Sequence, residues 1–124
     1  LGVGAGGLAI LAALPAAEAE ATIDANSHRY ARFASFDVGF LRAEVQAARE
    51  RGYAFLDSAV TPGTAALGVA IPGMQGDRPI AAFSVAAISS RMATTRLAEI
   101  AQVVQQQVRQ VGALLAAQAV PPAA

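Results

Sequence analysis

The chain has 124 residues, and its nine basic residues, all of them arginine, balance nine carboxylates to a net charge of zero. The arginines are scattered along the sequence, so no basic stripe is available to neutralise a phosphate backbone, and we do not expect this chain by itself to bind DNA or RNA. The absence of cysteine excludes disulfides, thiolate metal sites and cysteine nucleophiles, and it agrees with a reducing, cytoplasmic location.

The chain opens on an apolar, glycine-rich run, LGVGAGGLAILAAL, that holds no charged residue. A secretory signal is disfavoured because no basic residue precedes this run and four of its first seven residues are glycine. The run is too short to span a bilayer, so no membrane association is expected. Because the sequence begins without methionine, we interpret it as a segment of a longer protein.

The same glycines do not predict a nucleotide-binding loop. Their spacing departs from G-x-G-x-x-G, and no strand, lysine or hydroxyl stands where a phosphate would need one. We expect instead a glycine-rich loop that packs closely against a neighbouring segment or a ligand. This loop leads into a short helix over residues 7–14, which ends before Pro15. A second helix is expected near residues 16–25, with Pro15 at its first position.

Residues 24–35 are polar and aromatic and predict a loop or a partial helix. They contain His28, the single histidine of the chain, without a second histidine or clustered carboxylates nearby. A solvent-facing or capping role is therefore favoured over a metal ligand or a general base. We expect no metal site and no cofactor.

The clearest helical pattern covers residues 37–51. Leu41, Val45 and Ala48 recur at helical spacing and define the buried side of this helix. Asp37 is positioned to cap the N-terminus, and Gly52 suits the C′ position that follows the last turn.

Three strands are expected next, over residues 53–57, 64–71 and 80–87, with a loop at 58–63 and a hairpin turn at 72–79. Alternation gives the second and third strands one face of mostly large apolar side chains and one face of mostly small ones. The large face holds Leu67, Val69, Ile71, Ala81, Phe83 and Val85; the small face holds Thr64, Ala66, Gly68, Ala70, Ile80, Ala82, Ser84 and Ala86.

The small face leaves two alternatives open. Small side chains make room, and that room is either filled by a closely packed helix or left as a pocket. A pocket of roughly a few hundred Å³ with a few hydroxyl groups would be an ordinary small-molecule site. The residues alone do not decide between the two.

A last helix is expected to be capped by Thr94 or Thr95 and to run to about residue 117. Its apolar stripe is formed by Leu97, Ala101, Val104, Val108, Val111 and Leu115. We expect this stripe to pack on the large face of the sheet. Residues 1–119 are assigned to one domain and residues 120–124 to a disordered tail.

Four stretches stand in a recognisable order: GVGAGGLAILAALP, LRAEVQAARERGYA, TPGTAALGVAIPGMQGDRPIAAFSVAAISSRM and the closing helix. In order and spacing they resemble the C-terminal effector-binding domain of the IclR-type transcriptional regulators. The resemblance implies an α+β, GAF-like fold, with an antiparallel sheet flanked by helices and incomplete at its N-terminal strands. It also implies a domain that binds a small-molecule effector and forms a homo-oligomer, a dimer or a tetramer. DNA contacts would be made by a winged helix-turn-helix that these 124 residues do not include.

The resemblance further implies seven effector-binding residues, namely Ala5, Gly6, Leu56, Thr64, Ala66, Ser84 and Ala86. Family members that bind small keto acids place polar groups at several of these positions, whereas Leu56, Ala66 and Ala86 are apolar here. We therefore expect a larger and more apolar effector, aromatic or aliphatic, with one polar group.

An enzyme is not expected. The chain has one histidine and scattered carboxylates, and none of its serines stands in a nucleophile-elbow sequence. The remaining alternative is a structural or oligomerisation module that binds no small molecule.

Overall fold

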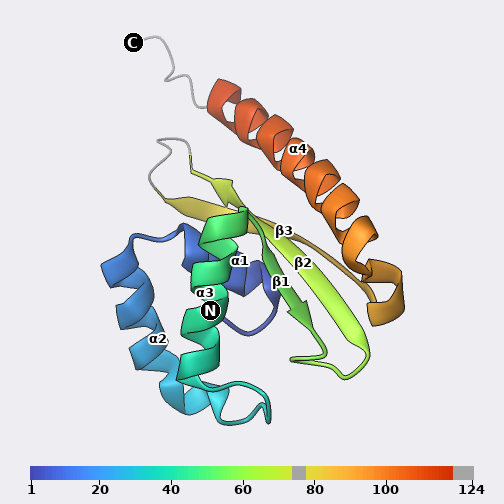
Figure 1. Cartoon of the computed structure of the whole chain (residues 1–124). Coiled ribbons are helices and arrows are strands. Elements are labelled where there is room, and N and C mark those ends of the chain that lie inside the picture. Colours follow the sequence, from blue (N-terminus) through green and yellow to red (C-terminus); the bar gives the residue numbers. More distant parts are fainter. Residues whose placement is uncertain (74–77, 119–124) are drawn as a thin grey trace.

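The computed structural model describes residues 1–73 and 78–118, and they form an α+β fold as predicted. Within these ranges the elements are four helices, three strands and one 3₁₀ turn, arranged as Figure 1 shows. The bounds are α1 Ala5–Ala13, α2 Ala16–Tyr30, α3 Val38–Arg51, β1 Ala54–Asp57, β2 Thr64–Pro72, β3 Pro79–Ile88, η1 Ser89–Met92 and α4 Thr94–Gln118.

The three strands form one antiparallel sheet in the order β1-β2-β3. In the β2–β3 hairpin Leu67 lies opposite Val85 and Val69 lies opposite Phe83, so the large faces of the two strands coincide as predicted. The small faces coincide too, because Gly68 lies opposite Ser84. Helix α4 lies on one side of this sheet, and α1, α2 and α3 lie on the other (Figure 1).

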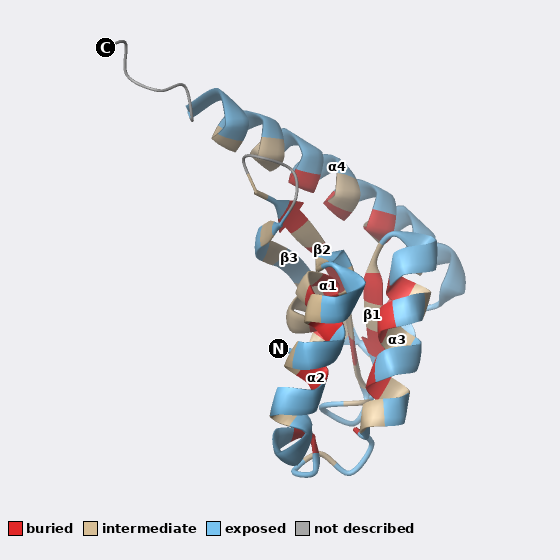
Figure 2. Ribbon diagram, turned by 90° about the vertical axis from the view of Figure 1, so that its left-hand side faces the viewer, coloured by how far each residue is buried: buried red, intermediate tan, exposed pale blue. Residues whose placement is uncertain are grey.

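Helix α4 packs on the large face. Its buried residues Ala101, Val104 and Val108 face the sheet (Figure 2) and form one apolar cluster with Leu67, Val69 and other residues of β2. Leu97, Val111 and Leu115 complete the predicted stripe as partly buried members of the same cluster. The prediction for this helix is therefore confirmed along the whole stripe.

The second apolar cluster holds α1, α2 and α3 together on the small-residue side of the sheet. It contains Leu8 and Leu11 of α1, Ile23 of α2 and Leu41 of α3, each at most 1% exposed. Helix α3 is bounded as its sequence predicts. The Asp37 carboxylate accepts a hydrogen bond of 2.7 Å from the Phe40 N–H, and Gly52 takes the left-handed conformation with φ of 86°.

The boundaries of three helices differ from the prediction. Helix α1 begins at Ala5, so Ala5 and Gly6 are helical rather than part of the loop. Helix α2 continues to Tyr30, because Ile23 and Tyr30 are both buried on the same helix and their packing outweighs the polar composition around them. The Leu97 N–H donates to the Ala93 carbonyl, which puts Ala93 at the capping position assigned to a threonine.

Two predictions concern residues outside the described part of the chain. They are the centre of the hairpin turn, residues 74–77, and the C-terminal tail, residues 120–124. Within the described ranges, no helix combines the length and the apolar character needed to cross a membrane.

Candidate functional site

The small face of the sheet is divided between a covered part and an open part. Gly68 lies in the covered part, where a Cβ atom on it would stand 2.3 Å from the carbonyl oxygen of Ala5. The α1 backbone therefore rests directly on β2 at this position. Helix α1 also borders β3, where a Cβ atom on Gly6 would lie at an ordinary contact distance of 3.7 Å from the Cβ atom of Ala82. One of the two alternatives, a closely packed helix, thus holds for this half of the face.

The open part is a cleft of about 280 Å³. Its floor is the small face at the Thr64 end of β2. One wall is the start of α1 with the residues before it, and the other is the loop between β1 and β2. The lining residues are Val3, Gly4, Ala5, Gly6, Gly7, Leu56, Ala59, Val60, Thr61, Thr64, Ala66 and Ser84. Three segments that are distant in sequence meet here.

Six of the seven residues that we predicted as a site line this cleft: Ala5, Gly6, Leu56, Thr64, Ala66 and Ser84. Ala86 is the exception. It lies on the same face, opposite Ala66 on the outer strand β3, but it is exposed and is not among the lining residues. We call the space bounded by these residues the α1–loop cleft.

The chemistry of the α1–loop cleft is apolar with a few hydrogen-bonding groups. Its polar side chains are the hydroxyls of Thr61, Thr64 and Ser84, and none of its lining residues is ionisable. Helix α1 adds backbone N–H groups, since Gly4 at its N-cap provides no side-chain oxygen for the first turn. The positive end of the helix dipole therefore borders the cleft beside an apolar floor.

The loop wall is fixed by hydrogen bonds at both of its ends. The Ser58 N–H donates to the Thr64 carbonyl at 2.9 Å, which closes the loop. The Asp57 carboxylate accepts hydrogen bonds from the Ser58 hydroxyl at 3.0 Å and from the Ser89 hydroxyl at 2.6 Å. Ser58 itself has a φ of 57°, an uncommon left-handed conformation for a residue with a side chain.

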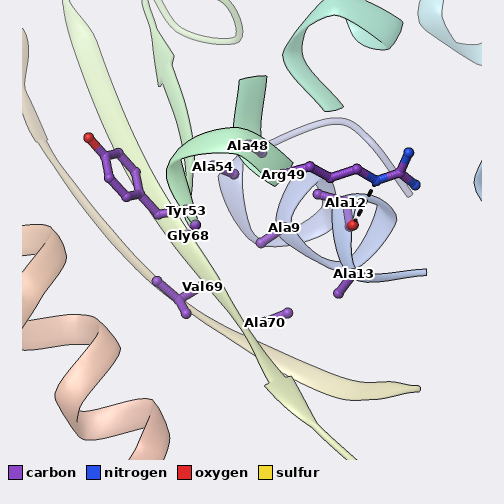
Figure 3. Close-up of a pocket in the computed structure, with 11 residues that line it drawn as sticks. Ala9, Ala12, Ala13, Ala48, Arg49, Tyr53, Ala54, Gly68, Val69 and Ala70 are labelled. Atoms are coloured by element: carbon purple, nitrogen blue, oxygen red, sulfur yellow. Dashed lines mark hydrogen bonds between the residues drawn. The ribbon is translucent and has the colours of Figure 1, made fainter. Parts of the chain in front are cut away.

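A second cleft, of about 270 Å³, lies at the opposite end of α1, between α1, α3 and the sheet (Figure 3). Alanines make up most of its lining, among them Ala9 and Ala13 of α1 and Ala54 of β1. Arg49 borders it, but its Nε already donates to the Ala12 carbonyl at 3.0 Å and its Nη2 to the Leu14 carbonyl at 3.1 Å. Arg49 therefore stabilises the C-terminal end of α1.

The ionisable side chains of the described residues lie outside the α1–loop cleft. Over residues 1–73 and 78–118, no group of three or more metal-ligating side chains comes together. His28 is exposed on α2, away from the α1–loop cleft, as its solvent-facing interpretation requires. Burial raises the pKa of the Tyr30 hydroxyl above its ordinary value, but this hydroxyl donates to the Leu1 carbonyl at 2.8 Å and lies outside the cleft.

The sequence did not predict four of the lining residues: Ala59, Val60 and Thr61 of the β1–β2 loop, and Val3, which precedes α1. These residues line the cleft because of the path of the β1–β2 loop and of the chain before α1. No local sequence pattern predicts that path. One usable signal was present, because the glycines at the start of the chain indicated a close approach to a neighbour or a ligand. Gly4 and Gly7 line the cleft in agreement with it.

Comparison with known proteins gives a consistent family match. The family model for the bacterial transcriptional regulator IclR C-terminal domain matches residues 1–113. No curated protein sequence shows a significant match to the chain.

Three solved structures illustrate the likeness in fold. The IclR protein of Thermotoga maritima aligns with a TM-score of 0.81 and 22% identity over 91% of this chain and 46% of its own. The C-terminal domain of the transcriptional regulator KdgR from E. coli gives 0.79 and 18% over 93% of this chain and 70% of its own. The repressor BlcR of Agobacterium tumefaciens gives 0.77 and 19% over 90% and 46%. The chain thus spans about half the length of the full regulators it matches.

Proposed function

Because this chain belongs to the IclR C-terminal family of bacterial transcriptional regulators, we propose that it is an effector-sensing domain that binds a small molecule in the α1–loop cleft. The observation that carries the proposal is the convergence on one cleft of six residues that the family resemblance implied. They come from α1, β1, β2 and β3, so their meeting in a single space is not a consequence of closeness in sequence.

The composition of the cleft supports an effector with an apolar body and one polar end. Leu56 and Ala66 provide an apolar floor, and Leu56 is only 5% exposed. A carboxylate would find donors in the Ser84 hydroxyl and in the N–H groups of the first turn of α1. The volume of about 280 Å³ is at the small end of the usual range for ligand sites. An aromatic or aliphatic monocarboxylic acid fits these requirements.

The proposed regulatory consequence follows from linkage. In a regulator that carries a DNA-binding domain and this domain together, an effector changes operator affinity only if it binds two arrangements of the protein with different affinity. Such coupling is typically about 1–3 kcal/mol. The domain would also contribute to self-association of the regulator.

The experiment is a thermal-shift measurement on this chain with benzoate, hexanoate and pyruvate as probes. At about 100 times its dissociation constant a ligand adds about 2.7 kcal/mol of stability, on the order of 10 °C in Tm for a domain of this size. We expect a shift with benzoate or hexanoate that is larger than the shift with pyruvate. A shift with pyruvate alone would contradict the apolar assignment.

Two variants locate the binding. Ala66→Trp fills the floor of the cleft and Ser84→Leu removes a donor, so each is expected to abolish the shift. Ala113→Trp and Ser90→Leu are the matched controls, because both positions are exposed and neither lines the cleft. Equal shifts in the cleft variants and in the controls would exclude the α1–loop cleft as the site.

A purely structural module remains the second candidate, because α1 already covers the small face at Gly68. It predicts a cooperatively folded chain that none of the probes stabilises.

A further inference from the structure

A closed ring of four hydrogen bonds lies at the base of the loop between β1 and β2. The Gly63 N–H donates to the Ser58 hydroxyl at 3.1 Å, and that hydroxyl donates to Asp57 Oδ1 at 3.0 Å. The Ser89 hydroxyl donates to the same Asp57 oxygen at 2.6 Å, and the Ser89 N–H donates to the Gly63 carbonyl at 2.9 Å. These bonds, which we call the Ser89 ring, join both ends of the loop to η1.

The Ser89 ring holds the part of the loop that borders the α1–loop cleft. It fixes Ser58 and Gly63, and the segment between them supplies three lining residues, Ala59, Val60 and Thr61. The four ring residues themselves do not line the cleft. Their hydrogen bonds therefore determine where this wall of the cleft stands without contacting its occupant.

The backbone at both ends of this segment shows why the loop needs such support. Ser58 has a φ of 57° and Gly63 a φ of 75°, both in the left-handed region. Glycine adopts this region readily, but a residue with a side chain persists there only where its surroundings hold it. Ala59 packs against the core, whereas Val60 is 40% exposed. The Ser89 ring thus carries much of the constraint on the wall near Val60.

Ser89 itself stands on a rigid support. At the end of the four-residue η1, Met92 is 3% exposed and belongs to the apolar cluster that α4 forms with β2. The Ala93 carbonyl, directly after η1, accepts a hydrogen bond from the Leu97 N–H in the first turn of α4. The Ser89 ring therefore connects the wall of the cleft to the buried start of α4.

We propose that Ser89 is a positioning residue of the effector site, which holds the wall of the α1–loop cleft in place through Asp57 and Gly63. This inference rests on the proposed function of the cleft. With the ring closed, the wall contacts a bound effector; with the Ser89 hydroxyl contact broken, residues 59–61 lose their fixed position. An effector therefore binds the closed form more tightly, and by linkage its binding strengthens the contact between Ser89 and Asp57. Occupancy of the cleft is communicated in this way to η1 and the start of α4.

The first test is the affinity for benzoate, measured by NMR titration of the ¹⁵N-labelled chain at a temperature where every variant is folded. Ser89→Ala removes one bond of the ring and is expected to raise the dissociation constant about two- to fivefold, the effect of one hydrogen bond. Ser89→Thr keeps the hydroxyl and is expected to bind benzoate as the wild type does. Ser90→Ala is the matched control, because Ser90 is an exposed neighbour in η1. A purely structural role of Ser89 would lower the stability of Ser89→Ala and leave its dissociation constant unchanged.

The second test is hydrogen exchange with and without saturating benzoate. Binding is expected to slow exchange of the N–H groups at positions 63 and 89 in the wild type, and to slow it less in Ser89→Ala. Equal affinity of the wild type and Ser89→Ala, with signals of the cleft moving in both, would overturn this inference and leave the sensor proposal intact. If no signal of the cleft moved saturably with benzoate or hexanoate, both proposals would be wrong.

Discussion

Gly68 is the residue at which the helix and the sheet come closest. Replacement by alanine would bring a Cβ atom to 2.3 Å from the Ala5 carbonyl oxygen, and backbone on both sides leaves no flexible group to move away. We expect Gly68→Ala to lower the free energy of unfolding by about 2–3 kcal/mol, as overpacking does in well-packed cores. Urea-induced unfolding measures this change.

Gly112→Ala is the matched control for Gly68→Ala. Gly112 is inside α4, and a Cβ atom there would lie at an ordinary contact distance of 3.6 Å from Pro72. Because alanine favours a helix over glycine, this variant is expected to be more stable by about 0.5–1 kcal/mol. If both variants shifted the unfolding midpoint equally, the close contact between α1 and β2 would be wrong.

Tyr30 predicts how stability depends on pH in the alkaline range. Burial raises the pKa of its hydroxyl above the ordinary value of 10.0, so the folded chain holds this proton at a pH where the unfolded chain has lost it. The contribution of Tyr30 is therefore fully present below about pH 10 and is lost as the pH rises through the folded pKa. The free energy of unfolding, measured by urea on both sides of pH 10, should fall with rising pH.

Tyr30→Phe separates this effect from other alkaline changes. The variant lacks the hydrogen bond to the Leu1 carbonyl, so at neutral pH it is expected to be less stable by about 1 kcal/mol. It should also lose stability less steeply above about pH 10. An identical pH dependence in wild type and variant would show that Tyr30 is not buried as described.

These residues also show which features of single residues could be predicted from the sequence. Asp37, Gly52 and the buried stripe of α3 follow from local rules of capping and periodicity, and the structure confirms them. Alternation placed Gly68 on the small face, but it could not say that α1 would cover it. Tyr30 lay in a segment expected to be partly irregular. The covering of Gly68 and the burial of Tyr30 both depend on contacts between distant parts of the chain.

At the scale of elements, the loop between β1 and β2 depends on its anchor to η1. Ser89 donates to the Asp57 carboxylate at 2.6 Å and its N–H donates to the Gly63 carbonyl at 2.9 Å. Ser89→Ala removes only the hydroxyl contact. We expect a loss of up to about 1 kcal/mol in the free energy of unfolding, because Asp57 is exposed and the bond is partly screened.

Hydrogen exchange tests whether this contact orders the loop. Faster exchange of the Gly63 N–H, which donates to the Ser58 hydroxyl, is expected in Ser89→Ala. Ser90→Ala serves as the control, since Ser90 is exposed and neighbours Ser89. Unchanged exchange at Gly63 in both variants would mean that the hydroxyl contact does not hold the loop wall.

Every predicted helix and strand exists, and β2 and β3 form the predicted hairpin. The errors concentrate where packing overrides composition. Glycine usually weakens a helix, yet Gly6 is helical in α1, whose backbone packs directly on β2 at Gly68. The polar composition of the second half of α2 favoured a loop or a partial helix, but the helix continues to Tyr30 because Ile23 and Tyr30 are both buried in the core.

For the whole molecule, the sequence left the small face undecided between a packed helix and a pocket. The structure contains both: α1 covers Gly68 in the middle of β2, and the α1–loop cleft remains beside Thr64 and Ala66 at the start of that strand. The division depends on where α1 crosses the sheet, and the periodicity of the strands carries no information about that crossing. Six of the seven residues that the family resemblance implied line the cleft end of this face.

The most direct test of the proposed site is an NMR titration of the ¹⁵N-labelled chain with benzoate. Amide signals of Gly4, Gly6 and Gly7 are expected to move most, together with those of Thr64 and Ser84, because these residues line the α1–loop cleft. Signals of Ala12, Ala13 and Gly52, which line the second cleft, should stay in place. Movement confined to the second cleft, or no saturable movement with benzoate or hexanoate, would contradict the assignment of this domain as a sensor of apolar acids.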